Sequence, residues 1–176
     1  MKKIAIIHDW LTGMRGGEKV LEIFCELFPE ADIFTLIHIP GSVSKIIEDR
    51  KIQTSFLQKI PLARKRYRSF LPLFPLAIEG FDLRGYDIVV SSSHCVAKGV
   101  LTSPATIHIC YCHTPMRYVW EHYNTYFGKG KKGLVSRFLM PPIAHYLRIW
   151  DVTSSNRVDH FVANSYNVAN RIKKYY

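Results

Sequence analysis

Short apolar runs alternate along the chain with segments whose apolar residues recur at helical spacing. Residues 3–7 form an apolar run rich in β-branched residues that stops at His8, and a glycine-punctuated loop covers residues 11–17. In residues 18–28 the apolar side chains lie three or four positions apart, which is typical of an amphipathic helix. This order predicts a buried strand, a glycine loop and a helix that Pro29 ends.

The same alternation continues to the end of the sequence. Further strands are expected at residues 32–37, 86–91, 106–111 and 160–163, a short helix or turn at 94–99, and helices at 143–155 and after the capping pair Asn164-Ser165. Two segments rich in basic residues, about 59–76 and 124–142, are expected to be loops. Strands that alternate with helices predict a Rossmann-like α/β domain, a parallel sheet with helices on both faces.

Composition supports one folded domain. The chain has 176 residues, of which 48% are hydrophobic, enough to bury a core. No apolar run approaches the ~20 residues that span a bilayer, and four cysteines are too few for a disulfide framework. We therefore expect a protein of the cytoplasm.

The net charge of +10 is distributed unevenly: residues 1–58 carry −1 and residues 59–176 carry +11. Such an excess predicts an anionic partner, namely nucleic acid, a phospholipid surface or a phosphorylated small molecule. In residues 59–76 a basic cluster directly precedes bulky apolar side chains, which suits an anionic membrane surface. A core-packed helix with a solvated basic face is the alternative. The cluster comprises Arg64, Lys65, Arg66 and Arg68. No signature of a nucleic-acid-binding motif accompanies it.

The glycine string Gly13-Met14-Arg15-Gly16-Gly17 joins the first strand to the first helix. It matches neither the dinucleotide-binding fingerprint nor the P-loop, so the use of NAD or ATP is not supported. Glycines before a helix N-terminus let a phosphate approach free backbone N–H groups. The alternative is a plain tight turn.

His113 follows the strand at residues 106–111, at the strand end where parallel sheets bind ligands. His108, Cys110 and Cys112 lie nearby, but strand alternation puts them on the face opposite His113, and the paired spacing of zinc sites is missing. We expect no metal site.

A second polar cluster, residues 91–95, also follows a strand. It lacks the nucleophile elbow of hydrolases, and its small hydroxyl residues are typical helix caps. His94 and Lys98 are candidates to line a pocket.

Four segments together resemble the N-terminal half of family-four GT-B glycosyltransferases, in particular bacterial mannosyltransferase-like members that build polysaccharides. They are residues 8–20 (HDWLTGMRGGEKV), 91–99 (SSSHCVAKG), 110–118 (CYCHTPMRY) and 163–172 (ANSYNVANRI). Their order spans nearly the whole chain.

The resemblance implies that residues 1–176 form the acceptor-side Rossmann-like domain. A C-terminal donor-binding domain with a Glu-x₇-Glu motif is absent from this sequence. It also implies that Gly16 and Gly17 lie near the donor diphosphate and that His113 contacts the donor sugar. Arg117 lies in a matching segment and joins His94 and Lys98 as a candidate acceptor or pocket residue. The family retains anomeric configuration without a metal, and the nucleotide-sugar is a substrate, so no cofactor is expected.

The predicted function is therefore transfer of a hexose, for example mannose, from a nucleotide-sugar to a saccharide or lipid-linked acceptor in cell-surface polysaccharide synthesis. The protein is expected in the cytoplasm, at the periphery of the inner membrane, without nucleic acid. Residues 170–176 end the chain without a glycine or proline stop, which indicates a fragment boundary; a frayed C-terminal helix that simply ends there is the alternative. Because the resemblance implies a separate donor-binding domain, the 176-residue chain is expected not to transfer sugar unaided. The alternative is a non-catalytic basic α/β module that binds a phosphorylated ligand or nucleic acid.

Overall fold

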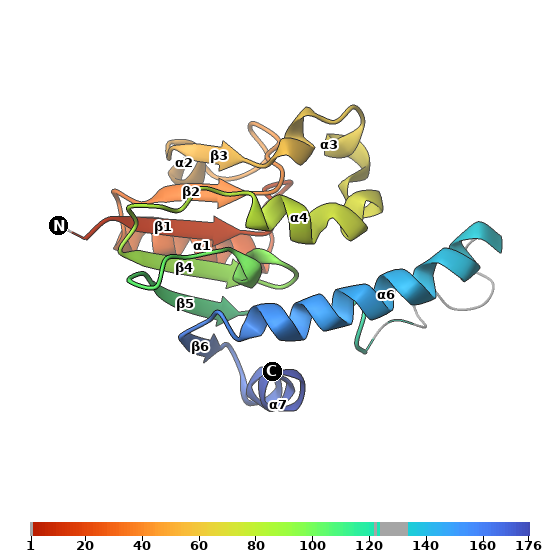
Figure 1. Cartoon of the computed structure of the whole chain (residues 1–176). Coiled ribbons are helices and arrows are strands. Elements are labelled where there is room, and N and C mark those ends of the chain that lie inside the picture. Colours follow the sequence, from red (N-terminus) through yellow and green to blue (C-terminus); the bar gives the residue numbers. More distant parts are fainter. Residues whose placement is uncertain (1, 122, 124–133) are drawn as a thin grey trace.

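A computed structural model describes residues 2–121, 123 and 134–176. Its centre is a six-stranded sheet in the order β3-β2-β1-β4-β5-β6, with every pair of neighbours parallel (Figure 1). The strands are β1 (Ile4–His8), β2 (Asp32–Thr35), β3 (Ile52–Thr54), β4 (Ile88–Ser93), β5 (Ile107–Cys112) and β6 (His160–Ala163). The predicted Rossmann-like α/β fold is confirmed.

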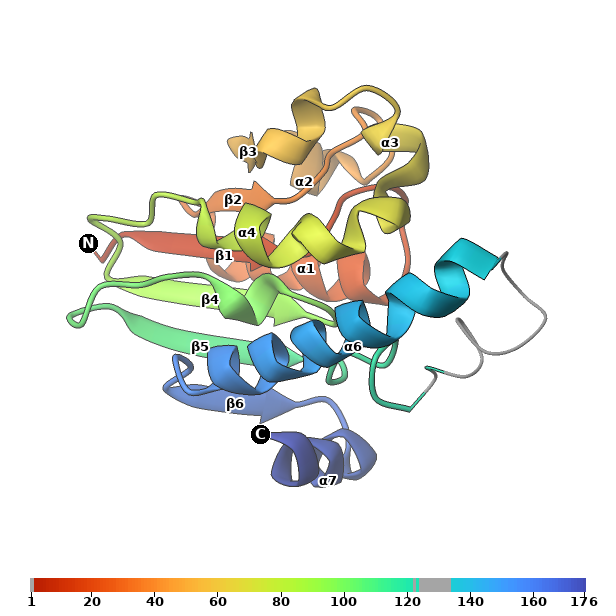
Figure 2. The same ribbon diagram turned by 45° about the vertical axis from the view of Figure 1, so that its right-hand side comes forward.

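Helices cover both faces of the sheet. The α-helices are α1 (Gly16–Leu27), α2 (Lys45–Glu48), α3 (Ala63–Arg66), α4 (Phe74–Glu79), α6 (Leu134–Ser155) and α7 (Tyr166–Tyr175), and the 3₁₀ helices are η1 (Phe56–Lys59), η2 (Tyr67–Leu73) and η3 (Ala97–Gly99). Figures 1 and 2 show α4 and α6 in front of the sheet and α1 behind it. No helix in the described part of the chain has the length and apolar content needed to cross a membrane.

Side-chain alternation along the strands creates two separate apolar layers. On β1, Ile6 packs with Leu21 of α1, whereas its neighbour Ala5 packs into the layer that contains Ala77 of α4 and Leu147 of α6. Neighbouring residues point to opposite faces because the side-chain period of a strand is two. A central strand buried on both faces must be apolar throughout, as the N-terminal run is.

The prediction of a loop at residues 59–76 is wrong. Most of this segment is helical, in η1, α3, η2 and the start of α4. Prolines 72 and 75 suggested irregular structure. Pro75 lies in the first turn of α4, where a missing N–H costs nothing and the fixed φ favours the helix. Pro72 lies inside η2, so neither proline abolishes the helix that contains it.

The prediction of a loop at residues 124–142 is wrong for residues 134–142, which belong to α6. Residues 124–133 lie outside the described residues. Pro141 and Pro142 interrupt neither the helix nor its packing. Both lie on the solvent side of α6, so water can bind the carbonyl groups that their missing N–H groups leave free. Among the described side chains of α6, those from Ile143 onward join the apolar layer on the sheet.

Candidate functional site

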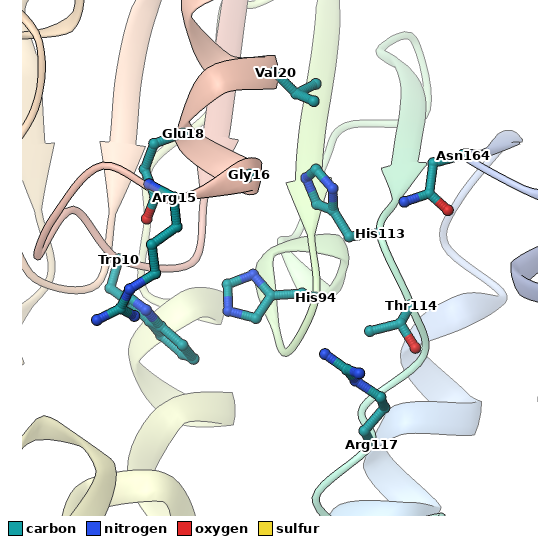
Figure 3. Close-up of a pocket in the computed structure, with 11 residues that line it drawn as sticks. Trp10, Arg15, Gly16, Glu18, Val20, His94, His113, Thr114, Arg117 and Asn164 are labelled. Atoms are coloured by element: carbon teal, nitrogen blue, oxygen red, sulfur yellow. The ribbon is translucent and has the colours of Figure 1, made fainter.

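A cavity of about 410 Å³ opens at the carboxyl ends of β1, β4 and β5. Residues from the first strand–helix connection and the start of α1, the β4–η3 loop, the segment after β5 and the connection between β6 and α7 line it (Figure 3). It lies next to β1 and β4, where the strand order reverses direction along the sheet. That is the position at which open parallel sheets bind ligands.

The glycine loop brings the start of α1 close to two imidazoles. A Cβ on Gly17 would lie 3.5 Å from Cε1 of His8 and 3.8 Å from Nε2 of His113. Gly16 and Gly17 both line the cavity, and the N-terminal N–H groups of a helix have no partners within the helix. Their amides therefore lie within reach of a bound anion.

Asp9 organises the loop that carries His94. Its buried carboxylate accepts hydrogen bonds from four successive backbone N–H groups, those of residues 94–97, at 2.6–3.0 Å. It also lies 2.9 Å from Nδ1 of His94. Burial alone would raise the pKa of Asp9, but the charge and hydrogen bonds of His94 outweigh burial and hold it well below its usual range. Burial disfavours the charged imidazole of His94, yet Asp9 raises the pKa of His94 above its usual value.

His113 lies beside the start of α1 and differs from His94 in its charge state. Its Nε2 is 2.9 Å from Oγ of Ser92, and its backbone N–H donates to the carbonyl of Ser93. Burial first, and then the nearby His8 and His94, lower the pKa of His113 to about 4. His113 is therefore neutral at pH 7 and offers one hydrogen-bond donor and one acceptor.

Of the three further pocket candidates, His94 and Arg117 line the cavity. The structure places Lys98 elsewhere. Its buried ammonium lies 3.1 Å from Oδ1 of Asp151 and donates to the Oγ of Ser154 at 2.6 Å, so it links η3 to α6.

Arg15 was missed as a site residue although it lies within the glycine string. Its side chain and that of Arg117 approach the cavity from opposite sides of His94 (Figure 3). A cation between glycines at a helix start is a signal that sequence reasoning could have used. Asn164, from the connection between β6 and α7, also lines the cavity; it lies in the resembling segment 163–172, but only the fold brings it to the site.

Within the described residues no group of three histidine, cysteine or acidic side chains is arranged to hold a metal ion. All four cysteines are buried and free. Cys110 and Cys112 pack with Val168 of α7, and His108 bonds to Ser91 at 2.8 Å.

The predicted membrane-facing cations lie on α3 and η2. The side chains of Arg64, Lys65, Arg66 and Arg68 are all exposed. Exposed leucines accompany them, with Leu62 at 64% and Leu76 at 61% exposure. The basic segment adjoins the cavity, because the ring of Tyr67 in η2 contacts the cavity-lining Trp10 at a centroid distance of 5.1 Å.

No family model matches the sequence, and no curated protein matches it significantly. Among solved structures, the chain is similar to the apo form of WaaB, a lipopolysaccharide outer core galactosyltransferase, with a TM-score of 0.50 and 16% sequence identity. The two share a fold. The match covers 98% of this chain and 42% of that chain, so the chain spans less than half of the length of the galactosyltransferase. The likeness supports the predicted GT-B glycosyltransferase fold.

Proposed function

We propose that the chain is the acceptor-side, N-terminal domain of a retaining glycosyltransferase. The reaction would transfer a hexose, for example mannose, from a nucleotide-sugar to a saccharide or lipid-linked acceptor in cell-surface polysaccharide synthesis. The observation that carries this proposal is one cavity in which a helix start, two arginines and a neutral histidine converge. The glycosyltransferase fold that the chain shares with WaaB supports it.

The cationic side of the cavity suits a diphosphate. The first amides of α1 at Gly16 and Gly17, together with the side chains of Arg15 and Arg117, surround space that a phosphate group could fill. Preorganised donors of this kind stabilise negative charge that develops on a leaving group. In the proposed reaction they stabilise the departing nucleoside diphosphate.

His113 has a different proposed role, because a neutral imidazole neither neutralises phosphate nor binds it strongly. Its position in the cavity beside the start of α1 suits a contact with a sugar hydroxyl next to the diphosphate. We assign to it the orientation of the transferred hexose, and to His94 a contact with the sugar or the acceptor.

Replacement of His113 by alanine tests this assignment in the full-length protein to which we propose these residues belong. We expect kcat with the preferred nucleotide-sugar to fall on the order of 100-fold, because the hexose loses an orienting contact. The free energy of unfolding should fall by only about 1 kcal/mol, the cost of leaving Ser92 without its partner. Steady-state kinetics and denaturant unfolding measure the two effects.

His145→Ala is the matched control, since His145 is exposed on α6 and lies outside the cavity. It should leave both quantities unchanged. An equal loss of folding and turnover in His113→Ala would reduce His113 to a structural residue. The 176-residue chain alone should show no turnover, because we propose that a second domain binds most of the nucleotide-sugar; measurable transfer by this chain would contradict that part of the proposal.

We also propose that the exposed cations of α3 and η2 hold the domain on an anionic membrane surface. In Figure 1, α3 and the first half of α6 extend beyond the carboxyl edge of the sheet, on the side where the cavity opens. Phe138 of α6 is 72% exposed. Cations beside exposed apolar side chains suit lipid headgroups, and this placement would present a lipid-linked acceptor to the cavity.

A further inference from the structure

A network of buried polar side chains connects Glu18 of α1 to Nε2 of His113. Ser92 lies at the centre, with its Oγ 2.9 Å from Nε2 of His113 and 3.1 Å from Nδ1 of His8. On the far side of the His8 ring, Nε2 lies 3.7 Å from Oε1 of Glu18. The residues behind His113 are at most 3% exposed, so a bound ligand would touch only His113 and the edge of Glu18.

Backbone register creates this order. His8 and Ser92 are direct partners in the parallel pair β1–β4, and His113 immediately follows β5, which pairs with β4. Glu18 is placed by α1, where its carboxylate accepts the backbone N–H of Arg15 at 3.0 Å. Each member is thus held by a different element, and a change in one of them alters the next.

One hydroxyl proton on Ser92 must serve two imidazoles. If Ser92 donates to Nδ1 of His8, it can only accept from Nε2 of His113, and the reverse arrangement exchanges both roles. The hydrogen positions of His8 and His113 are therefore coupled through a single O–H group.

Glu18 favours one of the two arrangements. Burial raises the pKa of Glu18, but the nearby imidazole of His8 and the backbone N–H of Arg15 outweigh burial and lower it, so Glu18 is an anion at neutral pH. A proton on Nε2 of His8 faces this anion favourably, although 3.7 Å is too long for a strong hydrogen bond. When the His8 ring is neutral, its Nδ1 then accepts from Ser92, and Ser92 accepts from Nε2 of His113.

We propose that Glu18, His8 and Ser92 are positioning residues that hold His113 as the neutral Nε2–H tautomer, so that its Nδ1 accepts a hydrogen bond from a hydroxyl group of the bound sugar. Nδ1 of His113 has no hydrogen-bond partner within the described residues and is not among their buried polar atoms. It is therefore the nitrogen that remains for a ligand. The role of the sugar rests on the proposed function; the tautomer does not.

The test is two-bond ¹H–¹⁵N NMR of the 176-residue chain with ¹⁵N-labelled histidine at pH 7. Native protein should show His113 with hydrogen on Nε2 and a bare Nδ1. In Ser92→Ala, the fixed partner is lost and His113 should become a mixture of both tautomers. Glu18→Gln should shift His113 in the same direction, while its amide oxygen can still accept the N–H of Arg15.

Ser91→Ala is a matched control within the same strand. Ser91 points to the other face of the sheet and bonds to Nε2 of His108 at 2.8 Å, so this variant removes an equivalent buried hydroxyl without touching the network. It should change the signals of His108 and leave His113 as the Nε2–H tautomer.

Native His113 with hydrogen on Nδ1, or charged at pH 7, would overturn the proposal without any variant. So would an unchanged His113 tautomer in a folded Ser92→Ala protein. In the active enzyme, Ser92→Ala should lower kcat roughly tenfold, as loss of a histidine-orienting partner does elsewhere. If no sugar transfer exists, the proposed function fails while the tautomer result stands.

Discussion

Histidines only a few ångströms apart take different charge states in this domain. His94 faces the carboxylate of Asp9 and is held toward its charged form, whereas among the described residues His113 has no acidic partner in direct contact and stays neutral. His108, on the other face of the sheet, is fully buried beside Ser91. The residue type predicts none of these states, because the pKa of histidine depends on burial and on the nearest charge.

The charge state of His108 makes stability depend on pH. Burial, supported by the nearby cations Lys98 and Arg157 and opposed by Asp159, lowers the pKa of His108 to about 4. Between pH 6.5 and 4 the unfolded chain therefore binds a proton at His108 that the folded chain does not, and stability falls as the pH falls. By pH 5 this contribution reaches about 2 kcal/mol.

Urea unfolding of the native chain and of His108→Gln at pH 7 and pH 5 checks this expectation. The native chain should lose about 2 kcal/mol more than the variant over this interval, because glutamine does not titrate. His160→Gln, at an exposed position, should follow the native chain. Identical pH dependence in His108→Gln and the native chain would show that the pKa of His108 is the same in the folded and unfolded chain.

At the scale of elements, the contact between η3 and α6 holds the β4–η3 loop against the body of the domain. Lys98 bridges it by its ion pair with Asp151. Gly99 allows the close approach: a Cβ there would lie 2.3 Å from two ring carbons of Trp150. The ring of Trp150 is itself held by the hydrogen bond from its Nε1 to Glu79 at 2.8 Å.

Gly99→Ala should therefore destabilise the domain by about 2–3 kcal/mol. The ring of Trp150 is fixed by its own backbone and by the hydrogen bond to Glu79, so it cannot move away from the added methyl group without a loss of free energy. Thermal or urea unfolding measures the loss. Gly16→Ala is a suitable comparison, since a Cβ at Gly16 meets nothing within 4 Å, and it should change stability far less. Adding Trp150→Leu to Gly99→Ala should recover part of the loss; full additivity of the two changes would contradict a direct clash.

At the scale of the whole molecule, the exposed basic cluster and the cavity lie close to each other. The positive excess belongs to residues 59–176. Its exposed cluster on α3 and η2 adjoins the cavity through Tyr67 and Trp10. The fold thus places a basic surface beside the proposed acceptor site.

Arg64→Ala combined with Arg66→Ala tests the membrane surface. Each cation near an anionic bilayer contributes about 1 kcal/mol, so the double variant should bind phosphatidylglycerol vesicles about 30-fold more weakly. Native binding should weaken steeply with salt and be absent from neutral phosphatidylcholine vesicles. Sedimentation with vesicles measures all three.

Lys173→Ala with Lys174→Ala is the matched control, because it removes the same charge from exposed positions at the end of α7. It should reduce binding much less. An equal loss in both double variants would show a general effect of net charge and no specific membrane surface.

Much of the architecture was predictable from local pattern. The apolar N-terminal run, the glycine loop and the β6 segment predicted strands and turns within a few residues of those observed, because period and turn chemistry are local properties. β3 and α2 were missed, since three or four residues are too few to display a period. Most of residues 59–76 and all of residues 134–142 are helical although loops were predicted there. Their prolines are tolerated because the cost of a proline depends on its position in the helix and on solvent exposure.

The sequence by itself determined the fold class, the strand-end positions of His94 and His113, and the glycine loop before the first helix. Only the tertiary structure decided which of these side chains meet. Lys98 lies outside the cavity, in an ion pair with Asp151. Ser92 lies within hydrogen-bond distance of two histidines that are 84 and 21 residues away in the sequence. Strand register and burial set these contacts and the charge states that follow from them, and both arise from pairing between distant segments.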